Sequence, residues 1–538
     1  MQDQDQDAPA TLEPSPALAG LATLSAAVAA CGGGGGSSEP PPPAAVLTAA
    51  DASRLLAQAS FGADRAEIER TRGLGAAAWI DGQIAMARSQ GHVDWLNAQG
   101  FNLYPDFQFS RSPTDYTVWR KFLSARDQLR QRVVFALSQI MVIGVGGVGS
   151  RWPAFQAAYY LDLLDRHAFG NFRALLEAVT LSPAMGNYLS MRGSRAADTN
   201  GRQPDENYAR EVMQLFTIGL VELEADGTPR GASPIDTYGQ DDVTGLARVF
   251  TGWDYTAGDN NTPATVITPL VNNASRHESG AKSFLGVTVP AGTSAADSLR
   301  IALDTLAAHA NVGPFIGRQL IQRLVTSNPS PAYVGRISAV WANDGNGVRG
   351  NLAAVVRAIL LDAEARDTAA ARASTSAGKL REPVLRFTQW ARAARVGSAS
   401  GQWALGDMSA PATRLGQSPL RSASVFNFYR PGYVPPNTSL ASAGRVAPEF
   451  QITTETSVAG YLNFMQSVID TTDGVLNTDL LPDYTAWLAL AADPQALADE
   501  ANLVLASDQL SAASVTLIRD AVAAIAATPR PPRRLAVA

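Results

Sequence analysis

The chain has 538 residues, of which 46% are hydrophobic and 17% charged, and its formal net charge is -6. This length exceeds the usual size of a single hydrophobic core, so we expect one large elaborated domain or two closely packed ones. The mild acidity and the lack of long runs of like charge argue against nucleic acid as a partner.

The only cysteine, Cys31, ends an apolar and uncharged run that begins at residue 17. Small residues precede it, and a stretch rich in Gly, Ser and Pro follows it. This pattern is typical of a lipobox, in which the cysteine is acylated after export. We therefore expect residues 1–31 to form a signal-like leader, residues 32–47 to form a flexible tether, and Cys31 to be the lipidation site. The membrane would be contacted only through this lipid anchor.

The leader departs from an ordinary export signal in its charge. Export signals normally begin with Lys or Arg, whereas the first basic residue here is Arg54 and residues 1–7 are acidic. The alternatives are a different start, an unusual signal or an alanine-rich tail without a targeting role. A single cysteine also excludes an intrachain disulfide, and it excludes cysteine catalysis in the rest of the chain.

Helical periodicity begins at Thr48, where Thr48 and Asp51 stand at capping-box spacing before two leucines. We predict a mainly α fold: a large multi-helix domain over residues 48–470 and a C-terminal helical extension over residues 471–538, with a loose basic tail from Pro529. No other apolar run is long enough to cross a membrane. Apolar stripes with a repeat of three or four residues predict helices within residues 129–140, 157–164, 172–179, 316–324, 352–360 and 453–527.

Strand signals are sparse. Residues 255–289 are rich in Asn and Gly with some alternating β-branched residues, so we expect an irregular excursion with at most a short β-hairpin. Residues 398–450 form a second stretch with little helical pattern. Loops of this length within a compact domain are often functional or bind partners.

Several short blocks occur in a fixed order along the chain, at residues 53–56, 60–62, 206–211, 215–219, 242–253, 277–286, 306–309, 381–383, 416–419 and 424–427. From about residue 48 to beyond residue 450 they resemble the bacterial family called domain of unknown function 1800. The resemblance implies an exported protein, often encoded beside a second family that looks like alkaline phosphatases or sulfatases. It therefore implies an exported partner of that kind, but no particular reaction.

Many members of that family carry a Trp-His pair on the helix that corresponds to residues 133–142. Here this segment reads Val-Val-Phe-Ala-Leu-Ser-Gln-Ile-Met-Val and contains no histidine. A metal site built on that pair cannot be transferred to this chain. We predict no metal site, and the sequence leaves the identity of any cofactor open.

The densest polar cluster lies at residues 205–211. On a helix, Glu206 can pair with Arg210 and Asn207 with Glu211, because each pair is four residues apart. We take both glutamates as candidate catalytic acids or bases, or as sugar-binding carboxylates, with Arg210 setting their charge and Asn207 as a ligand-binding candidate. The alternative is structural, with the acids at the helix N-terminus and Arg210 and Glu211 in buried ion pairs.

The four histidines lack the close spacing of a metal site. His277 lies in a polar loop with a glycine, where it would face a ligand, and it joins Asp242 as a catalytic candidate. Lys282, His309 and Arg381 are ligand-binding candidates. The alternative for His309 is capping of backbone carbonyls at a helix end.

Other motifs are weaker. Residues 198–201 and 344–347 have calcium-like spacing, but ordinary turns explain such Asp, Asn and Gly clusters better. The sequence contains no serine-hydrolase elbow, Walker A loop or strand-linked dinucleotide motif. The aromatic residues among positions 426–433 either line a sugar-binding groove or pack the long loop onto the helices.

Two functional hypotheses follow, both for an exported protein that is periplasmic or anchored at the outer membrane, including the cell surface. The first is hydrolase-like action on a glycan or another extracellular polymer. The second is a noncatalytic scaffold or partner subunit of another exported protein. The first predicts that the candidate residues meet at one concave site with a carboxylate of shifted pKa, and the second predicts dispersed, satisfied ion pairs.

Overall fold

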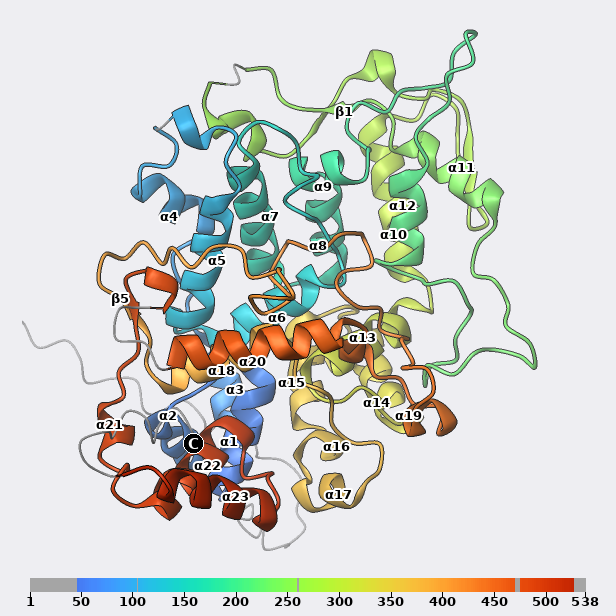
Figure 1. Cartoon of the computed structure of the whole chain (residues 1–538). Helices are drawn as coiled ribbons and strands as arrows, with labels where there is room; N and C mark the ends of the chain where they lie inside the picture. The colour runs from blue at the N-terminus through green and yellow to red at the C-terminus, as the bar shows by residue number, and fades with distance from the viewer. Residues whose placement is uncertain (1–45, 104, 259–260, 470–474, 527–538) are drawn as a thin grey trace, which may run out of the picture. The chain divides into compact units, whose positions relative to one another are not determined.

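The computed structural model describes residues 46–103, 105–258, 261–469 and 475–526. It contains 52% helix and 4% strand, with 23 helices and only small two-strand sheets among these residues, which confirms the mainly α fold class (Figure 1). The leader with Cys31, the tether up to residue 45 and the basic tail from Pro529 lie outside the described residues. None of the described helices is both long enough and apolar enough to cross a bilayer.

The first helix starts where the capping box predicts. Thr48 Oγ1 accepts a hydrogen bond from the Asp51 amide at 3.0 Å, and Asp51 Oδ2 accepts one from the Thr48 amide at 3.3 Å. This reciprocal cap satisfies two amides that the helix itself leaves without partners. The N-terminal helices are α1 (Ala49–Ala59), α2 (Arg65–Leu74), α3 (Ala76–Ala85), α4 (His92–Ala98), α5 (Ser112–Ser124), α6 (Gln128–Ser138), α7 (Pro153–His167), α8 (Phe172–Thr180) and α9 (Pro183–Tyr188).

Helix α6 is buried along its whole length. All 11 of its residues are buried, including Arg130, Gln131 and Arg132. It contacts α1, α3, α5, α7 and α13, so it is enclosed by helices from distant parts of the sequence. Buried polar side chains must find partners inside the protein. The polar groups of α6 therefore need partners from the helices and loops that surround it.

The middle of the chain adds the helices α10 (Asn207–Gln214), α11 (Gln240–Val249), α12 (Ala295–Ala308), α13 (Val312–Leu324), α14 (Pro331–Ala342), α15 (Leu352–Leu361), α16 (Ala363–Arg366) and α17 (Thr368–Ala373). The expected hairpin forms between β3 (Lys282–Phe284) and β4 (Val287–Val289), and β3 packs on α11. A second antiparallel pair joins β1 (Trp253–Asp254) to β2 (Val271–Asn272).

The long loop between residues 398 and 450 follows α18 (Pro383–Ala393) and contains the short helix α19 (Ser439–Ser442). It contacts the helices of the first half of the chain: the Trp119 indole donates to the Gly406 carbonyl at 2.9 Å, and the Val145 amide donates to the Leu420 carbonyl at 2.8 Å. These contacts hold a segment with almost no secondary structure of its own against α5 and the residues after α6.

The C-terminal segment is helical, as the periodicity predicts, and comprises α20 (Glu455–Ile469), α21 (Thr485–Leu488), α22 (Pro494–Ala506) and α23 (Ala512–Ala523). A short strand, β6 (Leu480–Leu481), interrupts it and pairs with β5 (Gly397–Ser398). Helix α22 packs on α1, where the Ser53 hydroxyl donates to the Leu503 carbonyl at 2.7 Å. The end of the described chain thus contacts its beginning.

Two glycines test the packing of these helices. A Cβ on Gly245 of α11 would lie 1.7 Å from the Ser283 carbonyl oxygen in β3, whereas a Cβ on Gly82 of α3 would have nothing within 4 Å. We expect Gly245→Ala to lower the free energy of unfolding by about 3 kcal/mol, because α11 and the hairpin must separate. Gly82→Ala should raise it by about 0.5 kcal/mol, because alanine favours the helix. Urea unfolding measures the free energy of unfolding of both variants. Equal values for the two would contradict the close packing of α11 on β3.

Candidate functional site

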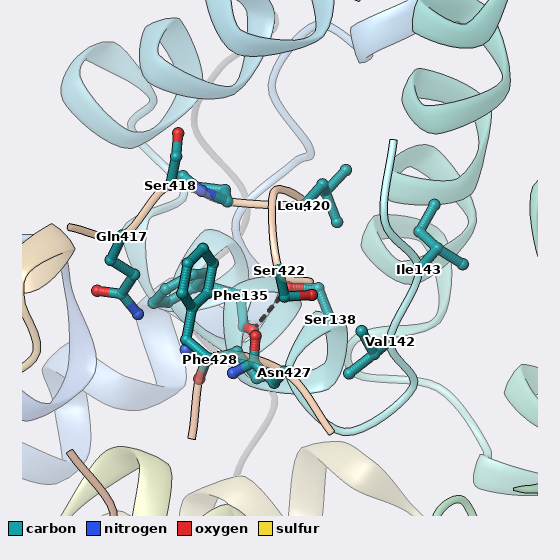
Figure 2. A pocket seen from close by; sticks show the side chains of 12 residues that line it. Phe135, Ser138, Val142, Ile143, Gln417, Ser418, Leu420, Ser422, Asn427 and Phe428 are labelled. Atoms are coloured by element: carbon teal, nitrogen blue, oxygen red, sulfur yellow. Dashed lines mark hydrogen bonds between the residues drawn. The ribbon is translucent and has the colours of Figure 1, made fainter. Parts of the chain in front are cut away.

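A narrow pocket forms where the end of α6 meets the long loop (Figure 2). Figure 2 shows Gln417 at the left of it, Val142 and Ile143 at the right, and Asn427 between them. Its cavity volume is about 10 Å³, room for a single water-sized group. The pocket therefore admits the tip of a ligand. Its lining consists of Phe135, Ser138, Gln139, Val142, Ile143, Gln417, Ser418, Pro419, Leu420, Ser422, Asn427 and Phe428.

A completely buried carboxylate, Glu382, stands next to this lining. Its Oε2 accepts three hydrogen bonds, from Gln417 Nε2 at 2.5 Å, from Gln139 Nε2 at 2.7 Å and from the Tyr429 hydroxyl at 2.8 Å. Its Oε1 is buried and has no hydrogen-bond partner within the described residues. The three donors hold the carboxylate in one orientation, and Oε1 keeps its acceptor capacity unused; Glu382 itself does not line the pocket but binds Gln139 and Gln417, which do. We call this arrangement the Glu382 pocket.

Two buried arginines flank Glu382. Arg132 of α6 donates to the Arg323 carbonyl, and Arg323 of α13 donates to the Gln139 carbonyl at 2.9 Å. Burial lowers the pKa of both guanidinium groups, and the negative charge of Glu382 opposes this effect. Burial and then the Glu382 charge raise the pKa of Tyr429 well above its usual value. The phenol therefore keeps its proton and can donate to Glu382.

Further buried charges surround this group. Lys379 pairs with Glu449 at 2.8 Å, and Glu449 Oε2 has no partner among the described atoms. Arg381, a ligand-binding candidate from the sequence, donates to Gln389 Oε1 at 3.2 Å, and burial lowers its pKa to about 10. Around Glu382 and Glu449, cations thus outnumber carboxylates. This excess disfavours a cationic ligand and favours a neutral or anionic one.

The chemical character of the lining fits hydroxyl groups. The amides of Gln139, Gln417 and Asn427 each donate and accept hydrogen bonds, and Phe428 offers an apolar ring. Gln139 Oε1, Ser418 Oγ and Asn427 Nδ2 are buried without a partner in the described part of the chain. Such unpaired groups gain a partner when a polar ligand enters.

The predicted pair Glu206 and Arg210 is present, with 3.2 Å between Glu206 Oε2 and Arg210 Nη2. Glu206 also accepts hydrogen bonds at 2.8 Å from Gln240 and from Thr244, both on α11, and these two bonds lower its pKa. The pair therefore fastens α10 to α11. Asn207 is exposed at the start of α10.

Asp242 and Lys282 have structural positions at the hairpin of β3 and β4. Asp242 Oδ2 accepts from the Gly239 amide at 2.8 Å, and its Oδ1 accepts from the Leu285 amide at 2.6 Å, so it caps α11 and holds the turn between β3 and β4. Lys282 is completely buried beside Ser298 Oγ at 3.5 Å, and burial lowers its pKa. Both side chains thus have structural partners.

The two candidate histidines, His277 and His309, contact backbone groups through their rings. His277 Nδ1 lies 3.0 Å from the Thr251 carbonyl, and its Nε2 is buried without a partner among the described residues. Burial lowers the pKa of His277, which favours the neutral imidazole. His309 Nδ1, just after α12, accepts from the Asn311 amide at 3.2 Å, a contact with an N–H group and not with the carbonyls that the capping alternative expects. No hydrogen bond or ion pair within the described ranges joins His277 to Glu206 or Glu211.

Glu211 differs from the other candidates. It is 9% exposed, its Oε2 has no partner among the described atoms, and burial raises its pKa. Its charge also affects a tyrosine: burial, and then the Glu211 charge, raise the pKa of Tyr188. A Cβ on Gly144, the residue after Ile143 of the pocket, would lie 3.3 Å from the Tyr188 ring. Glu211 is therefore a buried carboxyl whose pKa is raised by burial, and it does not line the Glu382 pocket.

Sequence reasoning misses the Glu382 pocket. The signal was present in three polar family blocks, at residues 381–383, 416–419 and 424–427, which lie in or beside the long loop. Within these blocks the sequence points to Arg381 and to the aromatic Phe426, and neither lines the pocket. Among the loop aromatics, Phe428 lines the pocket and Tyr429 is buried against Glu382, and a sugar-binding role for them stays a prediction.

The two calcium-like segments form hydrogen-bonded turns. Asp198 Oδ1 accepts from the Asn200 and Arg202 amides, and Asp344 Oδ1 accepts from the Asn346 and Val348 amides. These bonds are the Asx-type turns that the residue types favour. Within the described ranges, no three His, Cys, Asp or Glu side chains gather as a metal site.

Comparison with known proteins gives one match. A family model described as a protein of unknown function (DUF1800) matches residues 54–538. No curated protein and no solved structure gives a significant match to the chain. All residues of the Glu382 pocket lie within the matched range.

The hydrogen bond from Tyr429 to Glu382 can be tested by its removal. We expect Tyr429→Phe to lower the free energy of unfolding by about 2 kcal/mol, because a buried carboxylate loses a donor. Tyr433→Phe is the matched control: the Tyr433 side chain is half-buried in the same loop, and none of the described residues hydrogen-bonds to its hydroxyl. Chemical denaturation measures the free energy of unfolding of both variants. Similar decreases in the two variants would contradict the role of Tyr429.

The opposite pKa shifts of Glu211 and Glu206 predict opposite pH effects. Because the folded state raises the pKa of Glu211, ionisation destabilises the fold as the pH rises, and Glu211→Gln should be more stable than the parent at about pH 7. Because folding lowers the pKa of Glu206, Glu206→Gln should be less stable at that pH. Both differences should fade as the pH falls through the pKa values of the two carboxyl groups, because each group is then protonated in the folded and the unfolded state. Thermal unfolding across this range would refute the assignment if both variants changed in the same direction.

Proposed function

The chain belongs to the DUF1800 family, and we propose that it is an exported cell-envelope protein that binds a glycan or another hydroxyl-rich extracellular polymer at the Glu382 pocket. The observation that carries the proposal is the unpaired, fully buried Oε1 of Glu382 beside the amides of Gln139 and Gln417. A carboxylate that is already oriented accepts a hydroxyl proton without further ordering. Export and anchoring rest on the lipobox-like approach to Cys31.

Hydrolase-like action on the bound polymer is the catalytic form of this proposal. Hydrolysis of a glycosidic bond needs an acid that protonates the leaving oxygen and a carboxylate that activates water or attacks the sugar. The raised pKa of Glu211 supports the role of proton donor, and the orientation of the Glu382 carboxyl group by three donors supports the role of its partner. Glu206, Asp242 and His277 hold structural partners and give the catalytic form less support.

A noncatalytic partner subunit of an exported sulfatase- or phosphatase-like protein is the second candidate. It is favoured by the surface of α20, where Val458 and Leu462 stand four residues apart and are 46% and 61% exposed. Residues at this spacing share one face of a helix, and adjoining exposed apolar side chains are typical of contact surfaces.

Binding assays with Glu382→Gln test the first proposal. The amide oxygen of glutamine can keep the three donors, while its NH₂ group replaces the unpaired oxygen, so the substitution changes the acceptor that the ligand would use. We expect this variant to bind neutral polysaccharide about tenfold more weakly, the loss of one hydrogen bond to a charged group. Affinity electrophoresis in gels that contain a panel of envelope polysaccharides measures the effect.

Glu206→Gln is the control, because it removes a carboxylate charge outside the pocket. Unchanged binding in Glu382→Gln, or an equal loss in both variants, would overturn the Glu382 pocket as the binding site. Release of reducing ends by the parent, but not by Glu211→Gln, would support the catalytic form, whereas retention of polymer without cleavage would favour a noncatalytic role.

A further inference from the structure

A much larger groove opens at the other end of α6. Two adjoining pockets form it, with cavity volumes of about 400 and 380 Å³, and they share Met86, Ser124, Ala125 and Arg126. Parts of α1, α2 and α3 and the junction between α5 and α6 supply most of its lining. No residue lines both this α6 groove and the Glu382 pocket. The 11 residues of α6 separate them by roughly 16 Å along the helix axis.

The α6 groove is positively charged, although the chain as a whole is acidic. Two carboxylates line it, Glu67 and Asp127, against five cations, so three positive charges are in excess. The chain itself has a formal net charge of -6. A local excess of this sign concentrates anions in a concave site. The five cations are Arg70, Arg120, Lys121, Arg126 and Arg392.

Three of these cations already have partners. Arg70 pairs with Glu67 at 2.6 Å, and buried Lys121 pairs with Asp165 at 3.0 Å. Arg392 donates to the carbonyls of Gly62 and Leu123, each at 2.7 Å. They contribute to the electrostatic potential of the groove, but their donors are largely occupied.

Arg126 and Arg120 have donors to offer. Arg126 is exposed, and its side chain makes no hydrogen bond or ion pair with the described residues. Arg120 binds carbonyl groups near Gln90 through its terminal nitrogens, while its Nε is buried without a partner in the described part of the chain. Ser89 adds a buried hydroxyl that also lacks a described partner. These groups lie along one part of the groove.

The carboxylate of Asp127 opposes an anion in this groove. Its Oδ2 is held by Gln131 Nε2 at 2.9 Å and by the Ser89 amide at 3.2 Å, and Arg130 Nε lies 3.9 Å away. Its Oδ1 has no described hydrogen-bond partner. The amide donors and Arg130 compensate much of the Asp127 charge. Helix α6 also begins here, and the positive end of its dipole faces the same region.

We propose that the α6 groove binds the anionic groups, carboxylate or sulfate, of an acidic polysaccharide. Arg126 supplies the accessible charge-assisted donor, and Arg120 and Ser89 supply the buried ones. Guanidinium groups suit carboxylate and sulfate because their paired donors match two oxygens at once. The volume of the groove fits a segment of a polymer, unlike the water-sized Glu382 pocket. This second site is independent of the proposed role of Glu382.

Charge reversal at Arg126 tests the proposal in the full-length protein. The probes are oligogalacturonate, dextran sulfate and neutral dextran, and titration calorimetry measures their binding. We expect Arg126→Glu to weaken binding of at least one acidic probe about tenfold, with Arg126→Gln intermediate. Arg195→Glu is the control, since Arg195 is exposed and lines neither the groove nor the Glu382 pocket. Binding should also weaken from about 50 to about 500 mM NaCl, because salt screens exposed charges.

Equal effects of Arg126→Glu and Arg195→Glu would overturn the α6 groove as the site, and so would binding that does not change with salt. Thermal unfolding confirms that the variants fold, as exposed positions predict. Glu382→Gln separates the two proposals. Retained binding of the acidic probe in Glu382→Gln supports an independent groove even if the Glu382 pocket binds nothing. Loss in Glu382→Gln without loss in Arg126→Glu places the polymer at the Glu382 pocket alone and refutes the groove.

Discussion

The burial of the Glu382 carboxylate is the constraint on which the rest of the architecture depends. A buried charge without partners costs several kcal/mol, so the chain must bring donors to it. Gln139 supplies one from the end of α6, and Gln417 and Tyr429 supply two from the long loop. The loop has almost no secondary structure of its own, and these bonds, together with its contacts to α5, hold it in place.

Helix α6 connects this constraint to the rest of the molecule. Its side chains are buried on every face, so each polar group must be paired or must border a site. At its C-terminal end lie the Glu382 pocket and two buried arginines, where cations also favour the negative end of the helix dipole. At its N-terminal end lies the positively charged α6 groove. One buried helix thus separates the two proposed sites, the one for hydroxyl groups at its C-terminal end and the one for acidic groups at its N-terminal end.

The residues that sequence reasoning singled out divide by the range of their interactions. Glu206 and Arg210 are four residues apart on one helix, and the predicted pair forms. For Asp242 and His277, sequence reasoning suggested chemistry, but distant backbone groups occupy them: Asp242 binds the Leu285 amide, and His277 lies against the Thr251 carbonyl. Glu211 is on the same helix as Arg210, yet it points into the protein and has no ion pair among the described residues. Spacing alone does not distinguish a satisfied acid from an unsatisfied one.

The sequence by itself determined the family, the mainly α fold class, the cap at Thr48 and Asp51, the hairpin region and the long loop, because each rests on local patterns or on short blocks in a fixed order. Only the tertiary structure decided which polar residues meet. Gln139 and Glu382 are separated by 243 positions, and their contact depends on how α6, α13 and the loop pack together. Burial then decided the chemistry of the polar residues. Removal of water shifts the pKa values of buried groups and leaves some oxygens without hydrogen-bond partners, and the periodicity of the sequence shows neither effect.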